Sequence, residues 1–143
     1  MAWKSESVIA KAKPERIWQI YCALAWQEWD HDIATMTAES TLTHGAKVFI
    51  TMKDGKRHTA TLSDVENAQR FSYSAPLPGA ILTATHTLTA VEGGTKITHT
   101  FDIDGSFGVG KFFRWLTRDY VQHGLENNTA ALKQLAEASE QPR

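Results

Sequence analysis

The sequence predicts an α+β fold in which an antiparallel sheet of seven strands is covered by one long C-terminal helix. Three observations lead to this prediction. A first strand ends in Val8-Ile9-Ala10, turn signals divide the Thr- and Val-rich stretch 33–104 into six more strands, and residues 109–139 hold no proline and are rich in helix formers. Sequential strands joined by short turns pair antiparallel, and their apolar face has to be covered.

The composition is that of a folded protein without a strong electrostatic preference. The chain has 143 residues, with 15 Lys and Arg against 16 Asp and Glu, so its formal net charge is −1. The length favours one domain over 1–143. The near-zero charge argues against nucleic acid as a partner. Cys22 is the only cysteine, which excludes an intramolecular disulfide and a Cys-rich zinc site.

Targeting segments and common catalytic motifs are not found in the sequence. No apolar run has the length of a signal peptide or a membrane span, so we expect a cytoplasmic protein without integral membrane association. We expect a monomer or a weak homodimer. The sequence has no P-loop, nucleophile elbow, HExxH or CxxC, and its histidines show no recognised ligand spacing, so we expect no cofactor and no metal.

The N-terminal part predicts one strand followed by two short helices. The strand is expected over Ala2 to Ala10. Pro14 then stands where a helix begins, because its fixed φ suits the first helical turn. Helical spacing relates Ile17, Trp18, Tyr21 and Leu24. Trp26 and Trp29, three residues apart, indicate the second short helix.

The central part predicts strands near 33–41, 46–53, 57–65, 69–75, 80–91 and 95–103. In the last two, alternation places His86 and His99 on the apolar face, and threonines on the opposite face, towards water. A hairpin closed by Gly93-Gly94 would set position 86 opposite 101 and position 88 opposite 99, which makes the two histidines diagonal neighbours. By the same alternation, His58 points inward from an earlier strand.

The C-terminal helix predicts an apolar stripe that covers the sheet. The stripe steps mostly by three or four residues and contains Val109, Phe113, Leu116, Tyr120, Gly124, Ala131, Leu132 and Leu135. Gly124 is unusual because glycine inside a helix costs about 1 kcal/mol relative to alanine. It indicates either close packing against a strand or an opening onto a cavity.

This order of elements, with particular residues, resembles the START-like (SRPBCC) superfamily. The segments that carry the resemblance are 9–18 with Lys13-Pro14-Glu15, the corner Trp26-Gln27-Glu28-Trp29-Asp30, the hairpin Gly93-Gly94-Thr95-Lys96-Ile97-Thr98 and the helix end Leu132-Lys133-Gln134-Leu135-Ala136-Glu137. Within the superfamily, the chain is most similar to the polyketide cyclase/dehydrase and lipid-transport-like family. Relatives often carry an Asp just before the tryptophan corner, where this chain has Leu24-Ala25.

The resemblance implies the helix-grip fold, in which a curved sheet wraps around the long helix and leaves a cavity between them. Relatives hold a lipid, a polyketide or another apolar molecule there, and some are enzymes. We therefore expect a small hydrophobic ligand as partner. The residues expected to contact it are Met36, Ile50, Met52, His58, Tyr73, Leu82, His86, Ile97, His99, Phe101, Phe107, Phe113, Leu116 and Tyr120. Phe107, in a glycine-rich loop, would act as a movable plug.

Three functions stay open at this point. The first is binding or transport of a hydrophobic ligand, with inward His and Tyr side chains setting its orientation. The second is a cyclase or dehydratase that uses His86 or His99 as acid/base and Tyr73 as hydrogen-bond donor. The third is a protein-interaction module with a vestigial pocket. For each histidine, the alternative is a core residue satisfied by its neighbours.

Overall fold

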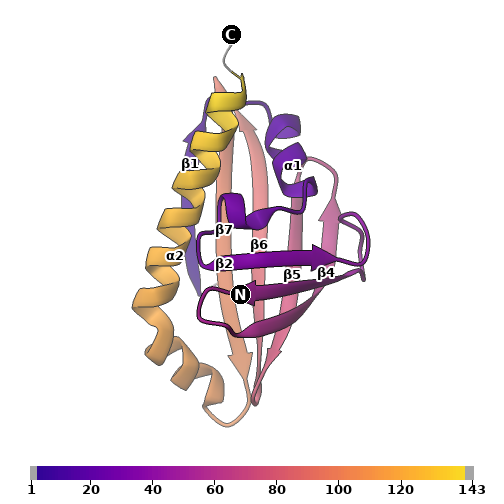
Figure 1. Cartoon of the computed structure of the whole chain (residues 1–143). Coiled ribbons are helices and arrows are strands. Elements are labelled where there is room, and N and C mark those ends of the chain that lie inside the picture. Colours follow the sequence, from indigo (N-terminus) through magenta and orange to yellow (C-terminus); the bar gives the residue numbers. More distant parts are fainter. Residues whose placement is uncertain (1–2, 141–143) are drawn as a thin grey trace.

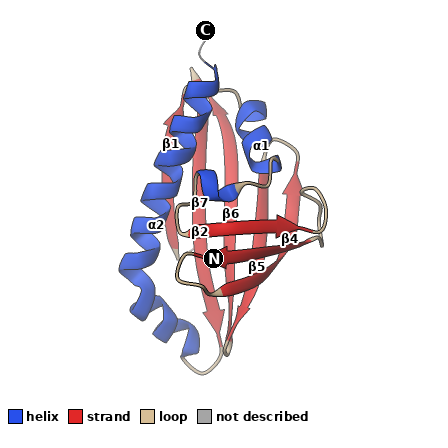
Figure 2. Ribbon diagram, in the orientation of Figure 1, coloured by secondary structure: helices blue, strands red, loops and turns tan. Residues whose placement is uncertain are grey.

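The computed structural model describes residues 3–140 and contains one seven-stranded antiparallel sheet in the order β1-β7-β6-β5-β4-β3-β2 (Figure 1). Its elements are β1 (Lys4–Ala10), α1 (Pro14–Cys22), the 3₁₀ helix η1 (Trp26–Glu28), β2 (Ile33–Ala38), β3 (Lys47–Met52), β4 (Arg57–Glu66), β5 (Arg70–Leu77), β6 (Ala80–Val91), β7 (Gly94–Gly105) and α2 (Val109–Glu140). Figure 2 shows that the helices lie on one side of the curved sheet and that β2 and β3 run across the longer strands. The predicted α+β fold is confirmed.

The N-terminal elements agree with the sequence prediction. Pro14 occupies the first turn of α1, and the tryptophan corner forms η1. The helix ends before Leu24, which was predicted to belong to it, because Leu24 adopts a left-handed φ of 56° that an α-helix cannot continue. Of the expected first strand, Ala2 lies outside the described residues.

The register predicted for the β6–β7 hairpin is wrong by two residues. His86 pairs directly with His99, and Leu88 with Ile97. The turn consists of Glu92 and Gly93 alone, because Gly94 already belongs to β7 and pairs with Val91. The inward and outward faces are unchanged, since a shift of two residues preserves the side-chain alternation.

The outer face of the sheet carries paired hydroxyl groups, as expected from its threonines. Ser72 Oγ lies 2.9 Å from Thr85 Oγ1, and Ser7 Oγ lies 2.9 Å from Thr98 Oγ1. Such cross-strand pairs stabilise this face, on which Ser7 is exposed and Ser72 is buried. Most apolar groups lie on the concave face, where the helices lie, whereas Ile9, Phe49 and Ile81 are exposed on the outer face.

The two halves of α2 differ in how deeply their apolar side chains are buried. In its second half, Leu125, Leu132 and Ala136 are buried. In its first half, Phe112, Trp115, Leu116 and Tyr120 are more than half exposed. Figure 1 shows the second half lying along β1 and β7 and the first half standing further from the sheet. The predicted apolar stripe is thus buried at Leu132 and largely open at Leu116 and Tyr120.

Candidate ligand-binding cavity

A cavity of about 530 Å³ lies between the concave face of the sheet and the first half of α2. Strands β3 to β7 contribute apolar side chains to its wall, among them Ile50, Ala60, Ala75, Leu82, Phe101 and Ile103. The helix contributes Phe113, Leu116, Tyr120, Val121, Gly124 and Leu125. An apolar wall around a hollow of this size is typical of sites for small organic molecules, whose volumes run to about 300–1,000 Å³.

Gly124 opens the helix side of this cavity. A Cβ added there would meet only Asp32 Oδ2, at 3.6 Å, which is ordinary contact. No strand packs closely against this position, so the first of the two explanations for a glycine here is wrong. Gly124 lines the cavity instead. The absence of a side chain at this turn of α2 leaves room beside Asp32.

Most of the residues expected to contact a ligand lie on the cavity wall. They are Ile50, Met52, His58, Tyr73, Leu82, Phe101, Phe113, Leu116 and Tyr120. Five others do not line it: Met36, His86, Ile97, His99 and Phe107. The two groups differ in position along the strands, because α1 and η1 cover one part of the concave face and leave the other part open.

His86 and His99 lie in the covered part, inside an aromatic cluster. The His86 ring stacks on Phe71 with a centroid distance of 4.3 Å, and it lies 4.5 Å from the ring of His99. Tyr21 and Trp29 close over both imidazoles. The two histidines are therefore core residues, and neither reaches the cavity wall.

Hydrogen bonds hold His99 in one tautomer. Burial raises the pKa of Tyr21 well above its usual value, so its hydroxyl stays protonated. Because Oδ1 of Asn128 can only accept, His99 carries its proton on Nδ1, and its Nε2 accepts from the Tyr21 hydroxyl over 2.8 Å. His99 Nδ1 then donates to Oδ1 of Asn128, also over 2.8 Å. Burial lowers the pKa of His99 to about 4. His86 is also held neutral by burial and by His99, and no group within residues 3–140 forms a hydrogen bond with its Nδ1.

The other three residues expected to contact a ligand lie away from the cavity, each for a different reason. Phe107 is fully exposed, at 104%, and its φ of 53° turns it away from the fold, so it does not plug the cavity. Ile97 is completely buried in the core. Met36 lies under the tryptophan corner, where its Sδ accepts a hydrogen bond from the backbone N–H of Trp26.

Sequence reasoning missed the acidic side of the cavity. Asp30 and Asp32, in the connection between η1 and β2, and Asp54, in the β3–β4 turn, all line it, together with Lys56 and His58. One available signal was the position of Asp30 at the end of the tryptophan corner. A second was the antiparallel pairing expected of strands 33–41 and 46–53, which places residues 32 and 54 at the same end of the two strands, as the pairing of Ile33 with Met52 shows. Within residues 3–140, no cluster of three or more His, Cys, Asp or Glu side chains is arranged to hold a metal ion.

Burial and mutual repulsion shift the titration of these polar groups. Burial and the charge of Asp32 raise the pKa of Asp30 to about 6, against the opposing effect of a hydrogen bond from the backbone N–H of Asp32. Burial, the nearby carboxylates and a hydrogen bond to Asp32 raise the pKa of Tyr120 to about 12. Burial, with Asp30 nearby, also raises the pKa of Tyr73. This side of the cavity therefore has a negative potential.

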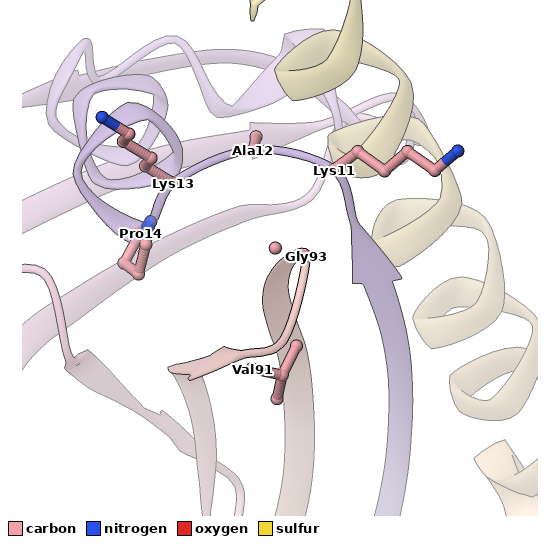
Figure 3. A pocket seen from close by; sticks show the side chains of 7 residues that line it. Lys11, Ala12, Lys13, Pro14, Val91 and Gly93 are labelled. Atoms are coloured by element: carbon pink, nitrogen blue, oxygen red, sulfur yellow. The ribbon is translucent and has the colours of Figure 1, made fainter.

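A second hollow, of about 370 Å³, lies where the β1–α1 connection meets the β6–β7 hairpin. Figure 3 shows that the side chains of Lys11 and Lys13 extend away from it in opposite directions. Its wall is mostly backbone and small side chains around Gly93 and Gly94. No polar side chain is aimed into this hollow, and we do not consider it a binding site.

The cavity and the fold agree with a comparison to known protein families. Residues 2–138 match the family described as polyketide cyclase / dehydrase and lipid transport. The chain belongs to this family. Membership in the polyketide cyclase / dehydrase and lipid transport family confirms the resemblance recognised in the sequence, and at a coarse level it supports binding of a hydrophobic ligand. No protein with a curated description matches the chain.

Solved structures share this family member's fold at low sequence identity. Protein NE0264 from Nitrosomonas europaea is 13% identical, with a TM-score of 0.74 over 96% of this chain and 95% of that one. A START superfamily protein from Mycobacterium smegmatis is 14% identical, with a TM-score of 0.67 over 92% and 97% of the two chains. DynU16, a putative protein in the dynemicin biosynthetic locus, is 16% identical with a TM-score of 0.73, over 97% of this chain and 48% of that chain. These similarities confirm the helix-grip fold. Among the described residues, no helix has the length and apolar character needed to span a bilayer.

Proposed function

We propose that this protein binds and carries a small hydrophobic molecule, such as a lipid, a polyketide or an aromatic compound, in the cavity between the sheet and α2. The observation that carries the proposal is an apolar hollow of about 530 Å³ that opens beside Gly124 and the half-exposed Leu116 and Tyr120. A hollow of this volume argues against the filled interior expected of a vestigial pocket.

The driving force for binding would be burial of apolar surface. Each Å² removed from water contributes about 25 cal/mol before the entropic losses of association are subtracted. Apolar side chains from β3, β6 and β7 supply such surface on one wall, and Phe113 and Val121 supply it on the other. The few polar groups would orient the ligand and select its head group.

The cyclase or dehydratase alternative loses its two imidazole candidates. His86 and His99 are buried under Tyr21 and Trp29, away from the cavity, and burial holds both of them neutral. Of the three catalytic candidates, Tyr73 is the one that lines the cavity. A hydroxyl whose pKa is raised donates a hydrogen bond to a ligand more readily than it gives up its proton. We therefore place binding before catalysis.

The test combines an unbiased search for a ligand with a designed obstruction. Native mass spectrometry of the purified protein should show a co-purifying small molecule. In parallel, the neutral fluorescent probe N-phenyl-1-naphthylamine should bind with one-to-one stoichiometry. Gly124→Leu places a large side chain in the open space beside Asp32 and should lower the affinity for the probe by about tenfold or more.

Ala130→Leu is the matched control, because Ala130 lies on the same helix, is exposed and does not line the cavity. It should leave binding of the probe unchanged. Equal binding by the wild type and by both leucine variants would show that the probe binds elsewhere. Absence of a co-purifying molecule together with absence of probe binding would reject the proposed function.

A further inference from the structure

Charge is unevenly distributed over the cavity wall. Three carboxylates, those of Asp30, Asp32 and Asp54, face one side of it, and Lys56 is the only Lys or Arg among the residues that line it. Lys56 Nζ lies 4.0 Å from Asp54 Oδ2, in a pair that is exposed to water. Among residues 3–140, neither Asp30 nor Asp32 forms a salt bridge. Two carboxylates of the cavity are thus left without a cation.

The carboxylates of Asp30 and Asp32 lie close together on the cavity wall. The backbone N–H of Asp32 donates to Asp30 Oδ1 over 3.2 Å, which keeps the two residues together, and Asp32 Oδ2 faces the open position at Gly124. Burial and the charge of Asp32 raise the pKa of Asp30, while the hydrogen bond from the backbone N–H of Asp32 and the charges of His31 and Lys53 lower it. An ionised Asp30 is therefore only partly compensated by the protein itself.

A hydroxyl at the same place is available to a ligand. Tyr73 lines the cavity, its ring stacks on Trp26, and burial, Asp30 and Tyr120 all raise its pKa. Tyr73 is only partly buried, and among residues 3–140 its hydroxyl makes no hydrogen bond to a protein group, so it is free to bond to a molecule in the cavity. A bound molecule with a polar group next to Asp30 would supply such a bond.

We propose that the ligand of this cavity is an amphiphile with a basic nitrogen, whose cationic end lies between Asp30 and Asp32 and whose apolar body lies along the sheet and α2. The nitrogen would donate hydrogen bonds to the two carboxylates and to the hydroxyl oxygen of Tyr73. Charge-assisted bonds of this kind are stronger than neutral ones. This inference rests on the proposed function, which it narrows from hydrophobic molecules in general to cationic amphiphiles.

Ligands with an anionic or a neutral head group are disfavoured by the same arrangement of charges. A carboxylate or phosphate head group would meet Asp30 and Asp32 as like charges, with only Lys56 and His58 on this wall to offset them. A neutral alcohol could bond to one carboxylate but would leave its charge uncompensated. The order of affinity expected for one apolar body is therefore amine, then alcohol, then carboxylate.

The test uses three probes with the same chain: decylamine, 1-decanol and decanoate, each below its critical micelle concentration at pH 7.5. Their affinities are measured by displacement of N-phenyl-1-naphthylamine and by calorimetry. The wild type should bind decylamine about tenfold more tightly than 1-decanol, and decanoate most weakly. The preference for the amine should decrease as salt is added, because ions screen the partly open carboxylates.

Neutralising the carboxylates should abolish the preference without closing the cavity. Asp32→Asn and Asp30→Asn should each lower the affinity for decylamine several-fold and change that for 1-decanol much less, and circular dichroism checks that each variant is folded. Asp104→Asn is the control, because Asp104 is an exposed carboxylate of β7 that does not line the cavity. It should change none of the three affinities.

The outcomes separate this inference from the proposal on which it rests. Binding of all three probes with equal affinity, or strongest binding of decanoate, would overturn the inference of a cationic ligand. It would leave the proposed binding of hydrophobic molecules intact. An amine preference that persists in both variants and at high salt would also overturn it. Failure of every probe, including the naphthylamine, would reject the proposed function and the inference together.

Discussion

Nδ1 of His99 and Oδ1 of Asn128 lie 2.8 Å apart, and this hydrogen bond joins the aromatic core to the cavity wall. The histidine is completely enclosed, whereas the asparagine lines the cavity from α2. Because Oδ1 of Asn128 can only accept, the proton of the imidazole lies on Nδ1, and Nε2 accepts from the hydroxyl of Tyr21. The hydrogen bond from His99, a residue of the core, therefore fixes the position of the Asn128 amide on the cavity wall.

Asn128→Asp should raise the pKa of His99. A carboxylate would then take the place of the amide oxygen, and an opposite charge at hydrogen-bond distance favours the imidazolium by about one to three pKa units. A ¹³C or ¹⁵N NMR titration of the imidazole gives the value directly. Asn127→Asp, at the exposed neighbouring position, is the control and should leave the pKa unchanged. An unshifted His99 in Asn128→Asp would mean that this hydrogen bond is absent in solution.

The buried imidazole should make the protein less stable in mild acid. The pKa of His99 lies at about 4 in the fold and near 6.5 when unfolded, so only the unfolded chain takes up a proton between these values. Stability is unaffected above pH 6.5 and falls as the pH decreases towards 4, by on the order of 3 kcal/mol in total.

The comparison that isolates this effect is urea unfolding of the wild type and of His99→Gln at several pH values. Other groups, including Asp30 with its opposite dependence, contribute equally to both proteins and cancel. His99→Gln should be clearly less stable than the wild type at pH 7.5, and the gap should narrow at pH 4.5. A gap that is independent of pH would contradict the lowered pKa.

The two halves of α2 should differ sharply in their tolerance of the same substitution. Leu132 is completely buried, so Leu132→Ala should destabilise the fold by about 2–5 kcal/mol. Leu116 is 58% exposed at the cavity mouth, and Leu116→Ala should cost less than about 1 kcal/mol. Urea unfolding measures both values. Similar losses at the two positions would mean that the first half of the helix is packed as tightly as the second.

Two glycines of α2 should respond to alanine in opposite directions. Gly124→Ala adds a methyl group to open space and removes the helix penalty of glycine, so it should stabilise the fold by about 0.5–1 kcal/mol. Gly110→Ala would place its Cβ 2.7 Å from the backbone nitrogen of Gly105 and should be destabilising. Thermal unfolding of the two variants decides the matter, and a destabilised Gly124→Ala would contradict the opening beside Asp32.

Much of the fold could be predicted because it depends on local patterns. Pro14 begins a helix through its fixed φ, and alternation assigns each residue of a strand to one face whatever the register. The hairpin shows where this reasoning ends. Two adjacent glycines allow a turn at either position, and the choice depends on how closely β1 approaches, since a Cβ at Gly94 would lie 2.0 Å from the carbonyl oxygen of Ala10.

The extent of the cavity could not be predicted, because it depends on which part of the concave face the short helices cover. His86 and Leu82 are inward residues of the same strand, yet one lies under Tyr21 and the other faces the hollow. Asp32 and Asp54 were missed for a related reason. They lie just outside β2 and β3, whose antiparallel pairing places both residues at the same end of the two strands. The sequence does not show that this end faces the hollow.

The long helix is at once a structural anchor and a wall. Its second half is held against β1 and β7, and its first half has solvent on one side and the hollow on the other. Amide hydrogens should therefore exchange with a gradient along one continuous helix, fast near Phe112 and slow near Leu132. A ligand of the kind proposed would then enter or leave when only the first turns of the helix open, at a far smaller cost in free energy than unfolding of the domain.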